Sequence, residues 1–363
     1  MMDIASLARP EILAMQPYAS ARSSMPDGGV LLNANEAPWS LVDEPGLAAL
    51  ELNRYPSPQP AALKERFADL YGVDAKGLLI TRGSDEGIDL LTRVFCRPGQ
   101  DAIAQCTPCF GMYNIAATIQ GAAVVSIPRD ARQDLRVDID ALCGAIRGDG
   151  RIRLVFLTSP NNPTGDSLSC SEIVRVIEAC AERALLILDE AYIEFSGDAS
   201  AVELLGRYPQ LVVLRTLSKA WAAAGLRCGT VIADPQLIDL LQRIMAPYPV
   251  STLVVDAALK LTAPGQAARQ QALIDSVRKT KTELLAFLEQ QAWIEKTWPG
   301  DANFVLLRVP DATGLVAWCE QHNIRIRSFH GQAQLDNCVR LSIGSEAEVR
   351  ALSNALREYG ASR

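Results

Sequence analysis

Histidine is scarce in this sequence, because its 363 residues include only His322 and His330. Nine cysteines are scattered without a framework, and the single C-x-x-C spacing of Cys106 and Cys109 has no second pair. Structural zinc sites need a closed set of sulfur and nitrogen ligands, so we expect packed, reduced thiols and no metal site. Reduced thiols in turn favour a cytoplasmic location.

The sequence also lacks an excess of positive charge and any long hydrophobic run. Its 35 lysines and arginines face 42 aspartates and glutamates, which gives a formal net charge of −7 and argues against a nucleic-acid partner. Asp3, Arg9 and Glu11 interrupt the opening of the chain, and no later run reaches membrane-spanning length. We therefore expect neither a signal peptide nor a membrane partner.

Strand-like and helix-like patterns alternate through the middle of the chain. Apolar runs such as 78–81 and 185–188 suit strands that are buried on both faces, and segments with helical spacing separate them. This alternation predicts an α/β fold whose main sheet is mostly parallel and covered by helices. The length is sufficient for about two domains.

Three regions are expected along the chain. Residues 1–45 contain several prolines and are typical of an arm that packs on a partner subunit or over a cleft, with a short helix possible at 4–13. Residues 46–250 contain the alternating pattern and form the large domain. Pro247 and Pro249 then break the chain, and residues 251–363 form a smaller α/β domain. Its strands are expected at 304–309, 324–327 and 338–343.

A hydroxyl, a lysine and an arginine follow a strand-like run near residue 214. Ser218 precedes Lys219, and Arg227 lies eight residues after the lysine. A lysine is a nucleophile only when its amine is neutral, so a catalytic lysine must be desolvated or placed near other cations. The uncharged segment 220–226 and Arg227 suit a lysine that forms a Schiff base with a carbonyl group. For this pair alone, a surface lysine in a loop is the alternative.

Two other segments place suitable groups at strand ends. Residues 82–87 form a glycine-containing turn between a strand and a helix, which directs free N–H groups to a spot suited to phosphate. A simply capped helix start is the alternative. Asp189 follows the strand 185–188, at the carboxyl end where open α/β sheets bind ligands. A carboxylate buried there is costly unless it meets a cation.

Four motifs occur together in a characteristic order. They are Ser-Pro-Asn-Asn-Pro-Thr-Gly at 159–165, Asp-Glu-Ala-Tyr at 189–192, Ser-Lys through Gly-Leu-Arg at 218–227 and Val-Arg-Leu-Ser-Ile-Gly at 339–344. This set resembles the fold-type I aminotransferases that use pyridoxal 5′-phosphate, over almost the whole chain. Closer likeness to the histidinol-phosphate aminotransferases lies at 33–36, 53–56, 82–86, 95–99 and 215–220. The resemblance implies a seven-stranded, mostly parallel sheet in the large domain.

The resemblance implies roles around the cofactor. Lys219 would bind the cofactor aldehyde as a Schiff base and then carry the proton between substrate and cofactor. Asp189 would face the pyridine nitrogen and keep it protonated, while Tyr192 and Asn162 would hydrogen-bond the ring oxygen. The cofactor phosphate would be surrounded by Ser84, Asp85, Ser218 and Arg227.

Two aromatic residues are also implicated by the resemblance. Phe110 would lie against the cofactor ring, where related enzymes often carry tyrosine, so stacking would remain and a phenol hydrogen bond would be lost. A plain core aromatic is the alternative for Phe110. Tyr55 would reach the phosphate from the neighbouring subunit, which implies a homodimer with shared active sites.

Arg340 would bind substrate, because a guanidinium pairs equally well with a carboxylate and a phosphate. Further candidates at the same mouth are Tyr18, Asn35 and Arg327, and a solvated charge at a strand end is the alternative for Arg327. The implied enzyme is a cytoplasmic transaminase. It would interconvert L-histidinol phosphate and 2-oxoglutarate with imidazole-acetol phosphate and L-glutamate.

Two other functions remain open from the sequence, and a third is disfavoured. An aromatic amino-acid aminotransferase is one, because imidazole and phenyl rings differ little to an apolar pocket. A decarboxylase of an amino-acid phosphate ester is another, since similar scaffolds support it. A cofactor-binding regulatory module is disfavoured, because no DNA-binding segment is attached.

Overall fold

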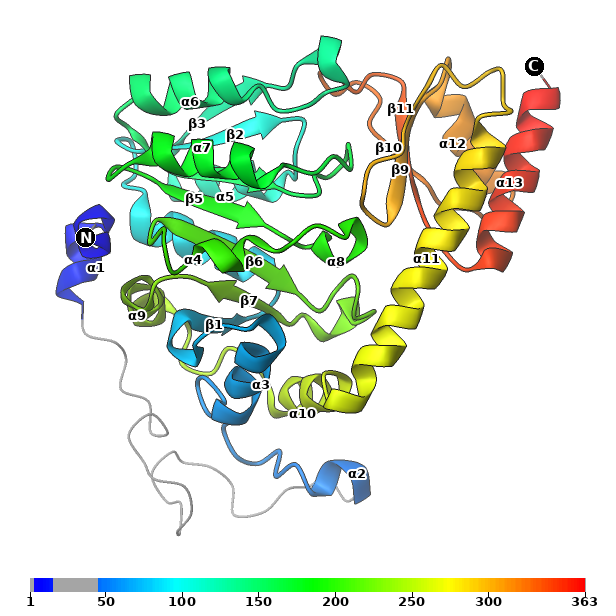
Figure 1. Ribbon diagram of the computed structural model, residues 1–363. Helices are drawn as coiled ribbons and strands as arrows, with labels where there is room; N and C mark the ends of the chain where they lie inside the picture. Colours follow the sequence, from blue (N-terminus) through cyan, green and yellow to red (C-terminus); the bar gives the residue numbers. More distant parts are fainter. Residues whose placement is uncertain (1–2, 16–44, 363) are drawn as a thin grey trace.

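Two β-sheets organise the residues that the computed structural model describes, namely 3–15 and 45–362 (Figure 1). The candidates Tyr18 and Asn35 lie outside these residues, as does most of the predicted arm. In the described part of the chain, no helix is long and apolar enough to cross a membrane.

The larger sheet has seven strands in the order β1-β7-β6-β5-β4-β2-β3. Its strands are β1 (Leu78–Thr81), β2 (Ala102–Thr107), β3 (Ala123–Pro128), β4 (Ile152–Thr158), β5 (Leu185–Asp189), β6 (Leu211–Thr216) and β7 (Gly229–Ile232). Neighbours from β3 to β6 are parallel, whereas β7 is antiparallel to both β6 and β1. The predicted mostly parallel sheet of seven strands is therefore confirmed.

Helices cover both faces of this sheet, which explains why β5 is apolar throughout. Leu186 and Leu188 pack into one core with helices of one face, and Leu185 and Ile187 pack into the other. The first face carries α3 (Ala61–Tyr71), α6 (Ile139–Gly148), α7 (Cys170–Cys180) and α10 (Thr252–Leu261). The second face carries α4 (Ser84–Phe95), α5 (Met112–Gln120) and α9 (Pro235–Ile244).

The first described residues differ from the predicted arm. Two short helices, η1 (Ile4–Leu7) and α1 (Pro10–Ala14), place apolar side chains in the core beside α9. Arg243 of α9 donates to the carbonyl of Leu13 at 2.7 Å. Residues 3–15 thus pack on their own chain, because Ile4 and Ile12 complete an apolar face. A further short helix, α2 (Pro45–Ala48), precedes α3.

The smaller sheet is antiparallel, in the order β10-β11-β9-β8. Its strands are β8 (Lys296–Trp298), β9 (Phe304–Arg308), β10 (Arg327–Ser328) and β11 (Cys338–Ser342). Three helices pack on one face, α11 (Ala267–Leu288), α12 (Ala312–Gln321) and α13 (Glu346–Ala361). Figure 1 shows α11 running from α10 to this sheet. A capping box of Ser345 and Glu348 begins α13.

Three features of this region differ from what the sequence suggested. The strand predicted at 324–327 begins only at Arg327, because Ile324 donates to the carbonyl of Cys319 and closes the end of α12. The short strand β8 was not predicted. The large domain was predicted to end at residue 250, but α10 still packs on the large sheet. The chain passes from the large sheet to the smaller one along α11.

Two glycines form a close contact between the two parts of the molecule. A Cβ on Gly165 would lie 2.9 Å from the Cα of Gly300, and Gly165 has a φ of +82°. The amide of Asp301 donates to the carbonyl of Gly165 at 2.6 Å. A side chain at either glycine would therefore separate the loop after β4 from the loop before β9.

Gly165→Ala should lower the free energy of unfolding by roughly 1–3 kcal/mol, because it combines an unfavourable φ with a clash against backbone. Urea denaturation at constant pH measures this change. The matched control is Gly206→Ala, since a Cβ there meets nothing within 4 Å, and it should change stability by less than about 0.5 kcal/mol. Equal stability of the two variants would contradict the importance of this contact.

Candidate active site

A cavity of about 270 Å³ lies at the carboxyl ends of β4, β5 and β6, beside the start of α4. It is lined by Ser84, Asp85, Phe110, Thr158, Asn162, Asp189, Ala191, Tyr192, Thr216, Ser218, Lys219, Ala224, Arg227 and Arg340. A larger hollow of about 810 Å³ lies at the amino ends of β5 and β6, and none of its lining residues is a lysine. The convergent polar groups favour the smaller cavity as the site.

Lys219 lies on the loop after β6 and is partly buried in this cavity. Burial, followed by the charge of Arg340, lowers the pKa of its amine, and Arg227 adds a smaller effect in the same direction. Asp189 opposes these effects. The structure therefore provides the desolvation and the cation that the sequence led us to expect, although Arg340 contributes more than Arg227.

Asp189 ends β5 and is almost fully buried, with 3% of its surface exposed. Its carboxylate accepts hydrogen bonds from the Tyr113 hydroxyl at 3.0 Å and the Ala191 amide at 3.1 Å. Burial raises the pKa of Asp189 to about 6. The Tyr113 hydroxyl also lies 2.6 Å from the Thr158 hydroxyl. Tyr113 was not a predicted site residue, and its only signal was a hydroxyl among the apolar residues of α5.

The start of α4 meets Arg227 at one end of the cavity. Gly83 is the N-cap of α4, and no side chain caps the helix. Arg227 binds the Asp85 carboxylate at 3.1 Å, and its other terminal nitrogen lies 3.4 Å from the Ser218 hydroxyl. A Cβ on Gly83 would lie 2.7 Å from Arg227, so only glycine permits this approach. Free first-turn N–H groups beside a guanidinium suit an anion.

The acidic side chains of this first turn do not both face the cavity. Glu86 turns back and accepts a hydrogen bond from the Arg82 amide at 2.7 Å, whereas Asp85 pairs with Arg227. The Ser218 amide donates to the Thr216 hydroxyl oxygen at 3.1 Å, which orients Ser218. Thr216 was not among the predicted site residues, although it lies within the segment 215–220 that carries the family likeness.

Arg340 brings the smaller sheet into the site from β11. It donates to the Asn162 side-chain oxygen at 2.5 Å, and the Asn162 amide nitrogen lies 3.5 Å from the Tyr192 hydroxyl. Burial raises the pKa of Tyr192 to about 12. The Arg340 guanidinium lies 5.1 Å from the ring of Phe304 and 5.8 Å from that of Phe329. No sequence pattern had pointed to Phe304 or Phe329 as residues of the site.

The remaining candidates have different positions. Phe110 lines the cavity and packs edge-on against Tyr113, with ring centroids 5.7 Å apart. Tyr55 is half exposed, stacks on Tyr248 at 4.5 Å and does not line the cavity of its own chain. Arg327 is exposed and does not line the cavity. It lies opposite Arg340 in the register of β10 and β11.

The sequence family described as aminotransferase class I and II matches residues 30–356 of the chain. The chain belongs to this family. The aminotransferase is 38% identical over 357 residues to histidinol-phosphate aminotransferase 1 of Haemophilus influenzae, with 98% of this chain and 99% of the relative covered. It is 41% identical over 347 residues to histidinol-phosphate aminotransferase of Stenotrophomonas maltophilia, with 95% and 94% covered.

A solved structure has the same fold. Histidinol-phosphate aminotransferase from Sinorhizobium meliloti, in complex with pyridoxal-5′-phosphate, superposes with a TM-score of 0.80 at 25% identity, covering 87% of this chain and 85% of that one. Pyridoxal 5′-phosphate is the cofactor of this family. The described residues fit it, because the uncapped start of α4 and Arg227 suit its phosphate, while the buried Asp189 suits a cationic ring nitrogen.

Asp189→Asn should stabilise the cofactor-free aminotransferase at high pH. Because burial raises the pKa of Asp189 from 3.8 to about 6, the folded state loses stability as the pH rises through about 6. That loss amounts to about 3 kcal/mol at most, and the variant removes it. Urea denaturation of the cofactor-free proteins should show a clear gain at pH 8 and a smaller gain at pH 5. A gain independent of pH would contradict this reasoning.

Proposed function

We propose that this aminotransferase transfers the amino group of L-histidinol phosphate to 2-oxoglutarate, giving imidazole-acetol phosphate and L-glutamate in histidine biosynthesis. The observation that carries the proposal is the nearly full-length similarity to histidinol-phosphate aminotransferases. A cavity that joins a lysine of lowered pKa to a guanidinium supports it.

The cofactor, when bound, supplies an aldehyde for the amino group and a ring that withdraws electrons. Lys219 binds the cofactor through its amine and later moves the proton at the substrate Cα. Asp189 holds the proton of the ring nitrogen, because a buried carboxylate is stabilised by a cation. Tyr192 and Asn162 bind the ring oxygen. The 3.5 Å distance between the Tyr192 hydroxyl and the Asn162 side-chain nitrogen supports their binding of one common atom.

The phosphate of the cofactor is bound by four residues in this proposal. Ser84 and Asp85 contribute backbone N–H groups from the first turn of α4, and Ser218 contributes its hydroxyl. Arg227 balances the negative charge, because a guanidinium and a phosphate form strong charge-assisted hydrogen bonds. Phe110 packs on the ring face.

Arg340 binds the anionic end of each substrate. Its Nε is buried and has no hydrogen-bond partner among the described residues, and such an unmade hydrogen bond costs about 1–3 kcal/mol. A carboxylate or a phosphate would satisfy this donor together with a terminal nitrogen. Glutamate offers the first group and histidinol phosphate the second, so one guanidinium serves both half-reactions. Other residues assigned to the mouth are Tyr18, Asn35 and Arg327.

The enzyme works as a homodimer with shared active sites in this proposal. Tyr55 lies outside the cavity of its own chain, so it contributes to the phosphate site of a second subunit. A cytoplasmic location agrees with the free thiols of all nine cysteines.

Borohydride reduction should fix the cofactor on Lys219, and peptide mapping of the reduced protein should find it there. Lys219→Ala should lose this covalent link, because it has no amine at that position. The control is Lys260→Ala, which removes an exposed lysine paired with Asp256 and should keep the link. Labelling of any lysine other than Lys219 would overturn the proposed chemistry.

The substrate is tested by comparing kcat/KM for histidinol phosphate, histidinol and phenylalanine. Histidinol phosphate should exceed histidinol by more than about tenfold, equivalent to 1.4 kcal/mol, because histidinol has neither a phosphate nor a carboxylate to pair with Arg340. Arg340→Lys should reduce this preference, since it lacks the planar fork. A smaller preference with efficient use of phenylalanine would indicate an aromatic aminotransferase, and release of carbon dioxide from an amino-acid phosphate would indicate a decarboxylase.

A further inference from the structure

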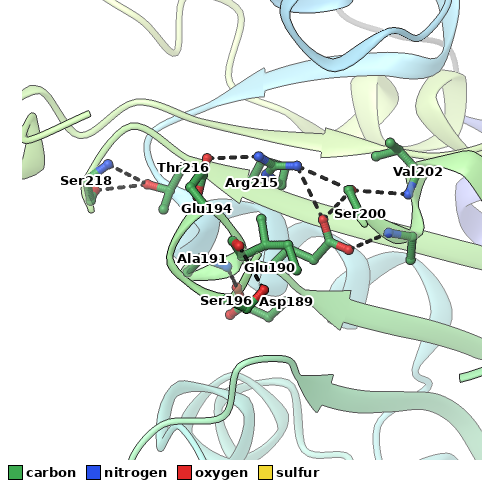
Figure 2. A network of polar contacts seen from close by, with 12 residues as sticks. Asp189, Glu190, Ala191, Glu194, Ser196, Ser200, Val202, Arg215, Thr216 and Ser218 are labelled. Carbon is green, nitrogen blue, oxygen red and sulfur yellow. Dashed lines mark hydrogen bonds and ion pairs between the residues drawn. The ribbon is translucent and has the colours of Figure 1, made fainter. Parts of the chain in front are cut away.

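Three charged side chains, Arg215, Glu190 and Glu194, form a largely buried network (Figure 2), and none of them lines the cavity. One terminal nitrogen of Arg215 lies 3.3 Å from the Glu190 carboxylate, and the other lies 2.8 Å from that of Glu194. Glu190 also accepts from the Ala201 amide at 2.7 Å and the Ser200 hydroxyl at 2.5 Å. Arg215 and Glu190 expose only 8% and 1% of their surfaces.

Stability alone does not account for this network. Burial raises the pKa of Glu190, with Arg215 opposing it. Burial also opposes the charge of Arg215, but Glu194 and Glu190 together raise its pKa above the usual value. Replacement of buried ion networks by apolar groups is often neutral or stabilising. A geometric role is therefore the better explanation for three charges at this position.

The network connects the segments that carry the principal groups of the site. Glu190 follows Asp189 directly, at the end of β5. Glu194 lies two residues after Tyr192, and Arg215 lies four residues before Lys219. The forked guanidinium thus joins the segment of Tyr192 to the strand that leads to Lys219.

Tyr192 depends on such a connection because its helix is very short. It is the N-cap of α8 (Ile193–Ser196), a helix of 4 residues. A single turn has no appreciable stability in isolation, so tertiary contacts decide its position. Apolar packing supplies part of these contacts, because Tyr192 and Phe195 lie in one buried cluster with Phe304. The polar contacts come from Arg215 and from Arg278 of α11, which donates to the carbonyl of Phe195 at 3.2 Å.

The Lys219 amine and the Tyr192 phenol belong to residues that line the same cavity. The Lys219 amine lies 5.5 Å from the centre of the Tyr192 ring. We propose that Arg215 is a positioning residue which, through Glu194, fixes the Tyr192 hydroxyl relative to the Lys219 amine. This inference rests on the proposed roles of Lys219 and Tyr192. Neither Arg215 nor Glu194 lines the cavity, so neither touches substrate or cofactor.

Two variants of the cofactor-loaded enzyme test the inference. Glu194→Gln keeps the size of the side chain and removes its charge, whereas Arg215→Lys keeps a charge and removes the fork. Each should lower kcat by roughly ten- to a hundredfold, since small displacements of reacting groups are costly. KM for both substrates should change by less than about threefold, because Arg340 and Arg227 are unchanged. The control is Glu203→Gln, an exposed carboxylate, which should match the unmutated enzyme.

A spectroscopic readout separates positioning from structural support. The midpoint of the pH titration of the bound cofactor's visible absorbance should shift by about 0.5 pH unit or more in both variants, because Tyr192 no longer contacts the cofactor in the same way. Lowered thermal stability with kcat and this midpoint unchanged would overturn the inference and leave the network a purely structural role.

A double-mutant cycle tests the route through Tyr192. In a Tyr192→Phe background, Glu194→Gln should lower kcat further by less than about threefold, because both changes remove the same contribution of the Tyr192 hydroxyl. If the fold-changes in kcat of the two single variants multiply in the double variant, Arg215 and Glu194 do not act through Tyr192. Failure of the proposed function is recognised separately, by borohydride labelling and the substrate comparison on the unmutated enzyme.

Discussion

The burial of the Asp189 carboxylate is the constraint on which the site depends. A charged group with little exposed surface is costly in a protein interior, and the Tyr113 hydroxyl and the Ala191 amide offset only part of that cost, since the pKa still rises to about 6. A bound cation opposite Asp189 would complete the balance. In the function proposed above, the ring nitrogen of the family's cofactor supplies that charge, so the same burial that weakens the cofactor-free protein would favour cofactor binding.

The position of Asp189 follows from the sheet. Parallel strands β4, β5 and β6 end at one edge, and the residues that follow them supply Asn162, Tyr192 and Lys219. The smaller sheet then closes this edge with Arg340. Its contact with Asn162 at 2.5 Å joins the two sheets across the cavity, and the close approach of Gly165 and Gly300 brings the same loop against the smaller sheet. Arg215 adds a third connection, between α8 and β6.

Sequence alone determined much of this protein. Four consecutive aliphatic residues at 185–188 required a strand covered on both faces, and the observed cores divide them alternately. The order of the four motifs identified the family, and they marked Lys219, Asp189, Asn162, Tyr192 and Arg227, all of which line one cavity. These features are local, because a strand's apolar pattern and a turn's residues act within a few positions of the chain.

Which side chains meet, in contrast, depends on the packing of distant segments. Tyr113 reaches Asp189 across 76 residues of sequence, and Arg340 reaches Asn162 across 178. In the sequence, Arg215 was part of a family motif and Glu194 an unremarked residue of a helical turn, yet their side chains join two segments of the site. Likewise, the sequence indicated a short helix at 4–13, but only the tertiary contacts place residues 3–15 against the core. Such contacts depend on how the layers pack and on where a buried charge finds a partner, and neither is set by nearby residues.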